Sequence, residues 1–215
     1  MLKRNGVLRS IAVVMLFSLA LGAYVSGACA QETAAPSKTT LDNLMAAYNG
    51  EKNANARYLA FATRANEDGY DIAASLFRAA AAAEQVHFDR HAEIIKKLGG
   101  TPAAVIETPV VNSTKENLEA AFNGETYESE VMYKEFLAQA KKENLPEAVD
   151  VFEDAQAAEG VHAKMYARML VTLESSKGLT KVFYLCPVCG NIVDAITTSM
   201  CPICSTDTRK FKMVK

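Results

Sequence analysis

The sequence predicts an all-α four-helix bundle with one long crossover, followed by a small metal-binding β domain. Three observations predict this fold class: four long stretches of helical periodicity, one unpatterned connection in mid-chain, and two CxxC pairs near the C-terminus. The chain has 215 residues and is 50% hydrophobic, which suffices for one sizeable core and a small appendage. Its formal net charge of −2, with acids and bases mixed, provides no basic stripe and argues against nucleic acid as a partner.

The first thirty residues have the layout of a secretory signal peptide. Basic residues precede an apolar run at 11–23, and small residues follow it up to Ala30. This run of about thirteen residues is short for a membrane span, which needs roughly 20, so an uncleaved anchor is the weaker alternative. Lipid attachment at Cys29 is also less favoured, because Ser26 stands where such signals carry a large aliphatic residue. We therefore expect cleavage after Ala30, export to the periplasm, and no stable membrane span in the mature chain.

Two helices are expected in the first half of the bundle. Apolar residues recur at intervals of three and four over 40–67, and the sequence NEDGY then interrupts the pattern. A second helix over about 70–98 stops at Gly99 and Gly100, as helices often do. The following stretch, TPAAVIETPVVNST, contains two prolines and has no clear period, so we expect a connection there.

Two more helices are expected in the second half. Ser113 with Glu116 suits a capping box that opens a helix over about 113–143. Pro146 suits the first turn of a helix over about 146–174. Short breaks within each pair imply antiparallel hairpins, and the long middle connection can run the length of the bundle as a crossover. The expected parts are a signal peptide, a polar spacer, the bundle and the small domain, at 1–30, 31–39, 40–176 and 180–215.

The two halves repeat each other. AAYNGE at 46–51 returns as AAFNGE at 120–125, which is 74 positions later. AAEQVH at 82–87 returns as AAEGVH at 157–162, which is 75 positions later. The copies share polar residues: one glutamate, and then a second glutamate with a histidine three positions beyond it.

This repeated pattern predicts a site for two metal ions. Helical residues three apart lie on one face, so each Glu-x-x-His pair can offer an oxygen and a nitrogen to one centre. One glutamate from each of two helices plus Glu-x-x-His from the other two is a known two-metal ligand set in bundles. A single pair would more often be a surface ion pair, but two copies in an alanine-rich context favour ligation, because buried carboxylates need compensation. The predicted ligands are Glu51, Glu84, His87, Glu125, Glu159 and His162.

Four further residues are candidates for a place in or near this site. Glu128 lies three positions past Glu125, whereas the matching position of the first half is Ala54, so a seventh ligand on one side would make the two ions inequivalent. Tyr58 and Tyr133 could hydrogen-bond a ligand carboxylate across the bundle, although helical tyrosines are more often plain core. His91 lies about 10 Å along the axis from Glu84, and we expect it at a surface or an interface.

The four C-terminal cysteines predict a separate metal site. Cys186 and Cys189 form one CxxC turn, and Cys201 and Cys204 form the other. Two such turns can close into a tetrahedral thiolate site that stabilises a domain too small for its own core. The spacing alone favours zinc over iron. Fusion to a two-metal site of carboxylates and imidazoles, which suits iron or manganese, favours iron, because zinc has no redox chemistry to supply electrons.

These motifs together resemble the rubrerythrin family, in which a ferritin-like di-iron bundle precedes a rubredoxin-like domain. The matching segments are NGE, EQVH, NGETYE, EGVH, CPVCG and CPIC, in that order along residues 40–215. The resemblance implies a peroxidase that reduces hydrogen peroxide at a di-iron centre and receives electrons through a tetracysteinate iron. It also implies a separate electron donor and a homodimer, with transfer between subunits because the distance within one subunit is too long.

The resemblance assigns roles to further residues. In the family, one iron shifts between the glutamate matching Glu128 and the histidine matching His87, and tyrosines matching Tyr58 and Tyr133 hydrogen-bond the site. The chain departs from the family pattern in its export signal, and in Ser205, which replaces a common glycine and could strain that knuckle. Two alternatives stay open: iron oxidation or storage of the ferritin kind, and a non-catalytic protein that binds zinc or another metal.

Overall fold

The computed structural model describes residues 38–215. The predicted signal peptide and nearly all of the spacer lie outside the described residues. Within them, no helix combines the length and the apolar character that a membrane crossing requires.

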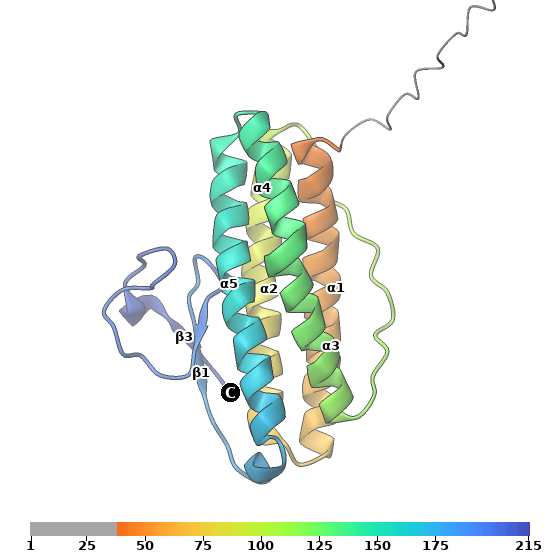
Figure 1. Ribbon diagram of the computed structural model, residues 1–215, viewed down its shortest axis with the longest axis vertical. Coiled ribbons are helices and arrows are strands. Elements are labelled where there is room, and N and C mark those ends of the chain that lie inside the picture. The colour runs from red at the N-terminus through yellow and green to blue at the C-terminus, as the bar shows by residue number, and fades with distance from the viewer. Residues whose placement is uncertain (1–37) are drawn as a thin grey trace, which may run out of the picture. The chain divides into compact units, whose positions relative to one another are not determined.

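The described part begins with a bundle of four helical rods, as the sequence predicts (Figure 1). The third rod is one continuous helical run in which the π-helical turn η1 joins the α-helices α3 and α4. The connection over 98–113 runs along the outside of α1, where Asn49 and Asn53 hold the backbone of Val105 and Glu107 by hydrogen bonds of 2.8–2.9 Å (Figure 1). This is the expected crossover. The elements are α1 Thr40–Glu67, α2 Asp71–Lys97, α3 Thr114–Tyr127, η1 Glu128–Met132, α4 Tyr133–Lys142 and α5 Pro146–Thr172.

The helix ends follow their sequence signals. Ser113 and Glu116 form the expected capping box at the start of α3, and Pro146 occupies the first turn of α5. Gly99 has a φ of 80° just after α2, a conformation that glycine adopts without a steric penalty.

The third rod contains a π-helical turn at η1, and the repeat explains it. Glu51 and Tyr58 are seven residues apart, whereas their counterparts Glu125 and Tyr133 are eight apart. One extra residue in a helix is accommodated as a π-turn, a feature frequent at functional sites. The π-turn therefore accommodates the one extra residue by which the repeat offset grows from 74 at Glu125 to 75 at Tyr133. It gives Tyr133 the place in the second half that Tyr58 has in the first.

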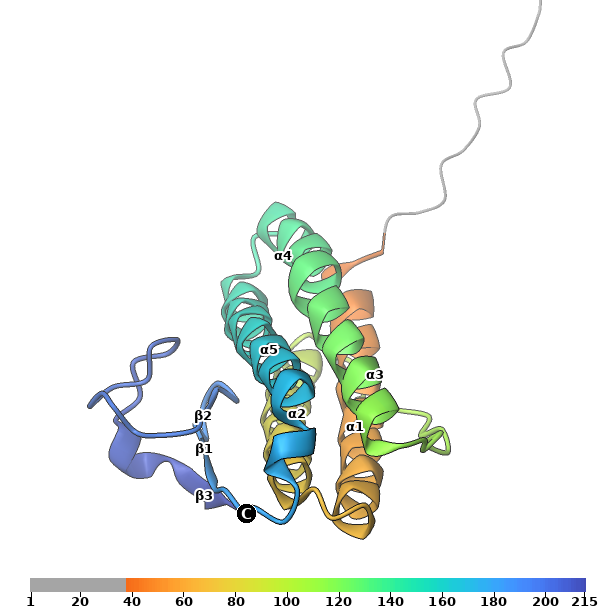
Figure 2. The same cartoon turned by 60° about the horizontal axis from the view of Figure 1, so that its bottom comes forward.

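The small C-terminal domain is a three-stranded antiparallel sheet in the order β2-β1-β3. The strands are β1 Phe183–Leu185, β2 Ile192–Val193 and β3 Lys212–Val214, with short 3₁₀ turns η2 Glu174–Ser176 and η3 Thr208–Lys210. Phe183, Leu185 and Ile192 are buried in one apolar cluster with residues of α1, α2 and α5, so the sheet packs on its own bundle (Figure 2).

Ser205 has a φ of 58°, which lies in the left-handed region that favours glycine. A serine there costs roughly 1 kcal/mol of backbone strain. The strain expected from the sequence is therefore present in the second knuckle.

Candidate metal centres

All four rods contribute acids or histidines to one buried layer. Each of these side chains is at most 1% exposed: Glu51 from α1, Glu84 and His87 from α2, Glu125 from α3, and Glu159 and His162 from α5. The spacing of three within α2 and α5 turns each glutamate and histidine to the same face. His87 Nδ1 lies 3.0 Å from Glu84 Oε2, and His162 Nδ1 lies 2.7 Å from Glu159 Oε2.

The layer divides into two groups that share two glutamates. One group is Glu51, Glu84, His87 and Glu159, and the other is Glu84, Glu125, Glu159 and His162. In each group the four ligand atoms lie within 4.8 Å of one another. Glu84 and Glu159 are therefore placed to bridge two ions, and each ion would have one further glutamate and one histidine of its own. We call these the His87 subsite and the His162 subsite.

The backbone of the small domain sets the tautomers of both histidines. His87 Nε2 lies 3.1 Å from the Cys189 carbonyl oxygen, and His162 Nε2 lies 3.0 Å from that of Gly190. Because a carbonyl only accepts, each Nε2 carries the hydrogen, and Nδ1 of the neutral ring is left with a lone pair. Burial, followed by the neighbouring His162, lowers the pKa of His87 to about 3, which keeps that ring neutral.

The surroundings of the histidine Nδ1 atoms and of the carboxylate oxygens show whether the residues fit metal ions. His87 Nδ1 faces carboxylate oxygens of Glu84 at 3.0 Å and Glu159 at 2.8 Å, so three atoms of the kinds that ligate metal ions converge on one point. Burial, followed by repulsion among the carboxylates, raises the pKa values of Glu84 and Glu159 well above their usual range. Glu51 Oε2 and Glu84 Oε1 are buried with no hydrogen-bond partner among the described residues. Each such group costs several kcal/mol unless a cation compensates it, so the donor set fits two metal ions.

Two tyrosines hold the glutamates that are not shared. The Tyr58 hydroxyl donates to Glu125 Oε1 at 2.8 Å, and the Tyr133 hydroxyl donates to Glu51 Oε1. Burial, followed by nearby carboxylates, raises both tyrosine pKa values well above the usual range, so both phenols keep their protons. Each phenol fixes one oxygen of a terminal glutamate and leaves the other oxygen for a metal ion.

Glu128 lies beside this layer and outside both groups of four. It begins the π-turn η1 and is half-buried, and its Oε2 is buried with no hydrogen-bond partner among the described residues. Burial, followed by repulsion from Glu51 and Glu125, raises its pKa well above the usual range. Its carboxyl group is thus near the metal layer without joining either set of close ligand atoms.

His91 is not at a surface, and that expectation was wrong. Its side chain is fully buried, its ring packs against Phe152 with centroids 5.6 Å apart, and its Nε2 lies 3.0 Å from the Tyr133 hydroxyl. Residues four apart share a helix face, so the spacing from His87 already placed His91 toward the core. The distance along the axis excludes ligation to the same ions and does not exclude burial.

The four cysteines form the second site. Their Sγ atoms lie within 4.8 Å of one another, with 3.6 Å between Cys186 and Cys204 and 3.6 Å between Cys189 and Cys201. These separations far exceed a disulfide bond of about 2.05 Å. Hydrogen bonding with Cys189 lowers the pKa of Cys186 to about 5, which favours a thiolate. The cluster fits one tetrahedral thiolate metal ion.

The two sites touch within a single chain. The first knuckle, at 186–190, contacts both His87 and His162, so the expectation that the distance within one subunit is too long is wrong for this chain. Gly190 permits the contact: its φ is 78°, and an added Cβ would overlap Nε2 of His87. The carbonyl that faces His87 belongs to Cys189, whose sulfur is one of the four in the cysteine cluster.

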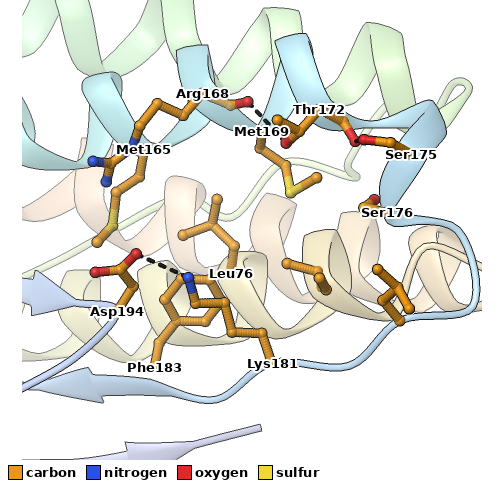
Figure 3. A pocket seen from close by; sticks show the side chains of 12 residues that line it. Leu76, Met165, Arg168, Met169, Thr172, Ser175, Ser176, Lys181, Phe183 and Asp194 are labelled. Carbon is orange, nitrogen blue, oxygen red and sulfur yellow. Dashed lines mark hydrogen bonds and ion pairs between the residues drawn. The ribbon is translucent and has the colours of Figure 1, made fainter.

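A groove of about 300 Å³ lies between α2, α5 and the segment leading into β1 (Figure 3). Leu76, Met165, Met169 and Phe183 line it, and Lys181 pairs with Asp194 at 2.8 Å along one side. None of the predicted ligands lines this groove, so it is separate from the metal layer.

Comparison with known proteins identifies the family. Residues 42–170 match the family model described as Rubrerythrin. The chain is 38% identical to nigerythrin of Nitratidesulfovibrio vulgaris, over 77% of this chain and 82% of that protein. It is 34% identical to rubrerythrin-2 of Clostridium acetobutylicum, over 80% of this chain and 95% of that protein. A structure of nigerythrin in its fully reduced, all-ferrous state superposes with a TM-score of 0.77 at 36% identity, covering 86% of this chain and 91% of that one.

The comparisons and the donor sets identify the metals. The carboxylate and histidine layer is a di-iron site, and the four thiolates form a rubredoxin-like site for one more iron. The ferritin-like bundle and its small C-terminal sheet are confirmed as the fold. The chain belongs to the rubrerythrin family.

Proposed function

We propose that this chain is a non-haem di-iron peroxidase that reduces hydrogen peroxide to water, with electrons relayed through its tetracysteinate iron. The observation that carries the proposal is the pair of hydrogen bonds from His87 and His162 to the carbonyls of Cys189 and Gly190. They link the thiolate site to both metal subsites of the bundle, a connection that a structural zinc ribbon would not need.

The proposed reaction is balanced by two electrons and two protons. When bound as ferrous ions, the two irons supply two electrons to the O–O bond, and hydrogen peroxide with two protons becomes two waters. The chain holds the site dry, because every ligand in both groups is at most 1% exposed. Electrostatic interactions are stronger in such a site than in water.

The roles proposed for the residues follow from their contacts. Glu84 and Glu159 would bridge the ions, Glu51 and His87 would serve one subsite, and Glu125 and His162 would serve the other. Tyr58 and Tyr133 keep two of these carboxylates oriented, and the carbonyls of the knuckle keep both imidazoles in the Nε2–H tautomer.

Glu128 is proposed as the seventh ligand, which serves one side only. One of its oxygens is buried without a hydrogen-bond partner in the described part of the chain, and its pKa is raised; both support a carboxyl group that is held beside the metal layer and can be drawn into it.

The test compares two forms of the full chain, one with iron at the cysteines and one with zinc there and iron only in the bundle. Both are reduced without oxygen and given hydrogen peroxide with excess reductant. Sustained peroxide consumption only in the all-iron form supports the proposal. Equal turnover in the zinc form would remove the relay from the mechanism, and rapid oxidation of added ferrous iron without peroxide turnover would favour iron oxidation or storage.

Export to the periplasm is proposed from the sequence at 1–30, and a homodimer is proposed from the family resemblance. Intact mass of the chain recovered from a periplasmic fraction tests the first, with Gln31 expected as the first residue. Sedimentation of the mature chain tests the second.

A further inference from the structure

Two matched aromatic groups surround the tyrosines of the metal layer. In each group a tyrosine and two phenylalanines occupy positions related by the 75-residue offset, and adjacent ring centroids are 5.4–6.3 Å apart. The fourth member of each group comes from the position four residues past a metal-layer histidine. The first group is Tyr58, Phe61, Phe77 and Tyr166, and the second is Tyr133, Phe136, Phe152 and His91.

The fourth member is the one that differs, and it changes the hydrogen bonding. Tyr166 packs against Tyr58 with centroids 5.8 Å apart, but its hydroxyl is buried with no hydrogen-bond partner among the described residues. His91 Nε2 instead lies 3.0 Å from the Tyr133 oxygen. Among residues 38–215, Tyr133 therefore has two polar partners, Glu51 and His91, whereas Tyr58 has Glu125 alone.

Counting protons fixes the direction of this chain of hydrogen bonds. Tyr133 has one hydroxyl hydrogen, and a metal-binding Glu51 carboxylate can only accept it. His91 Nε2 must then carry a hydrogen and donate it to the Tyr133 oxygen. The neutral ring has no second hydrogen, which agrees with the absence of a hydrogen-bond partner for its buried Nδ1 among the described residues. The opposite tautomer would bury an N–H group without an acceptor, which is rarer and more costly.

We propose that His91 is a positioning residue for the His87 subsite, acting on Glu51 through the phenol of Tyr133. The hydrogen bond that Tyr133 receives polarises its own O–H group and strengthens the bond that it donates to Glu51. Phe136 and Phe152 exclude water from this chain of hydrogen bonds. The His162 subsite has no such support at Tyr58, so the fourth aromatic position is a built-in difference between the two halves. The inference rests on Glu51 being a metal ligand, as the proposed function has it.

The first test reads the tautomer directly in the unmodified chain. The full chain is loaded with zinc, which is diamagnetic and has no redox chemistry, and its three histidines are observed by ¹⁵N NMR. We expect His91 to show a protonated Nε2 and a free, unprotonated Nδ1, with the signal assigned by its loss in His91→Gln. A proton on Nδ1 of His91 would overturn the proposal.

The second test measures zinc affinity by chelator competition. His91→Phe should weaken zinc binding at one bundle subsite by about tenfold, the lower end of the effect of losing an outer partner of a ligand. His91→Gln should stay within about threefold of the parent, because its amide N–H can take the place of Nε2. Tyr166→Phe, the matched control, removes a hydroxyl that has no hydrogen-bond partner within the described part of the chain, and it should leave both subsites unchanged.

Parental affinity in His91→Phe, or equal loss in His91→Phe and His91→Gln, would contradict the positioning role. If His91→Phe does not fold, the NMR result on the parent chain decides. An iron-loaded chain that does not turn over peroxide would refute the proposed function. The NMR and zinc-affinity results do not depend on turnover, so they would still decide the role of His91.

Discussion

Replacing Gly190 by alanine should separate the two iron sites without removing a ligand. The glycine has a φ of 78°, and an added Cβ would overlap Nε2 of His87, so the knuckle or the imidazole must move. The left-handed backbone costs an alanine roughly 1 kcal/mol, and loss of the bond between His87 and the Cys189 carbonyl costs about 1 kcal/mol more. We expect Gly190→Ala to be destabilised by about 2 kcal/mol.

Gly178→Ala is the matched control. Gly178 has a φ of 74°, and no atom of residues 38–215 lies within 4 Å of an added Cβ, so this variant shares the backbone strain and not the overlap. It should lose about 1 kcal/mol of stability and keep the parental contact between the two sites.

The assay is rapid mixing of the reduced, iron-loaded chains with hydrogen peroxide, following the visible absorption of the ferric tetrathiolate. Because His87 loses its outer partner, Gly190→Ala should re-oxidise its cysteine iron roughly 10–100-fold more slowly than the parent. Gly178→Ala should match the parent. Equal re-oxidation rates in Gly190→Ala and Gly178→Ala would refute the role given to the contact between Cys189 and His87.

Three further predictions concern single sites. Glu128→Ala should lower peroxide turnover while the chain still binds iron in the bundle, and undiminished turnover in steady-state assays would remove Glu128 from the site. Two variant chains are mixed: Cys201→Ser, which lacks a cysteine ligand, and Glu159→Ala, which lacks a bundle ligand. The mixture should not turn over peroxide, because the knuckle contacts the histidines of its own chain. Restored turnover in the mixture would show electron transfer between subunits. Burial raises the pKa of Glu51 from 4.5 to about 7. The proton on Glu51 therefore stabilises the folded, metal-free chain fully below pH 4.5, and this stabilisation is lost as the pH rises through about 7. Between pH 4.5 and about 7, the unfolding free energy of metal-free Glu51→Gln should therefore fall less than that of the parent in denaturant titrations. Identical pH profiles for the two chains would contradict the raised pKa of Glu51.

The helices and the ligand spacing could be predicted because both are local. Apolar periodicity, capping residues and the interval of three between Glu84 and His87 are set by neighbours along one helix. The repeat then supplied the second half of the site. It also held a signal for the π-turn, since the offset grows by one between Glu125 and Tyr133, but only the structure shows how the helix accommodates the extra residue.

The contacts that were missed depend on packing between distant segments. Cys189 and His87 are 102 residues apart, and no local pattern brings a knuckle of the small domain onto the bundle. His91 and Tyr133 are 42 residues apart, and their side chains meet only across the core of the folded bundle. The spacing of four from His87 places His91 toward the core, but its hydrogen-bond partner on another helix had to be seen in the structure.

Metal content measured together with the visible spectrum, on the full chain purified without oxygen, tests the central claim most directly. The account predicts three irons per chain, one for each group of ligands. It also predicts a ferric tetrathiolate absorption that bleaches with reductant and returns on addition of hydrogen peroxide. Zinc at the cysteines of the native protein, or an absorption that does not return with peroxide, would contradict it.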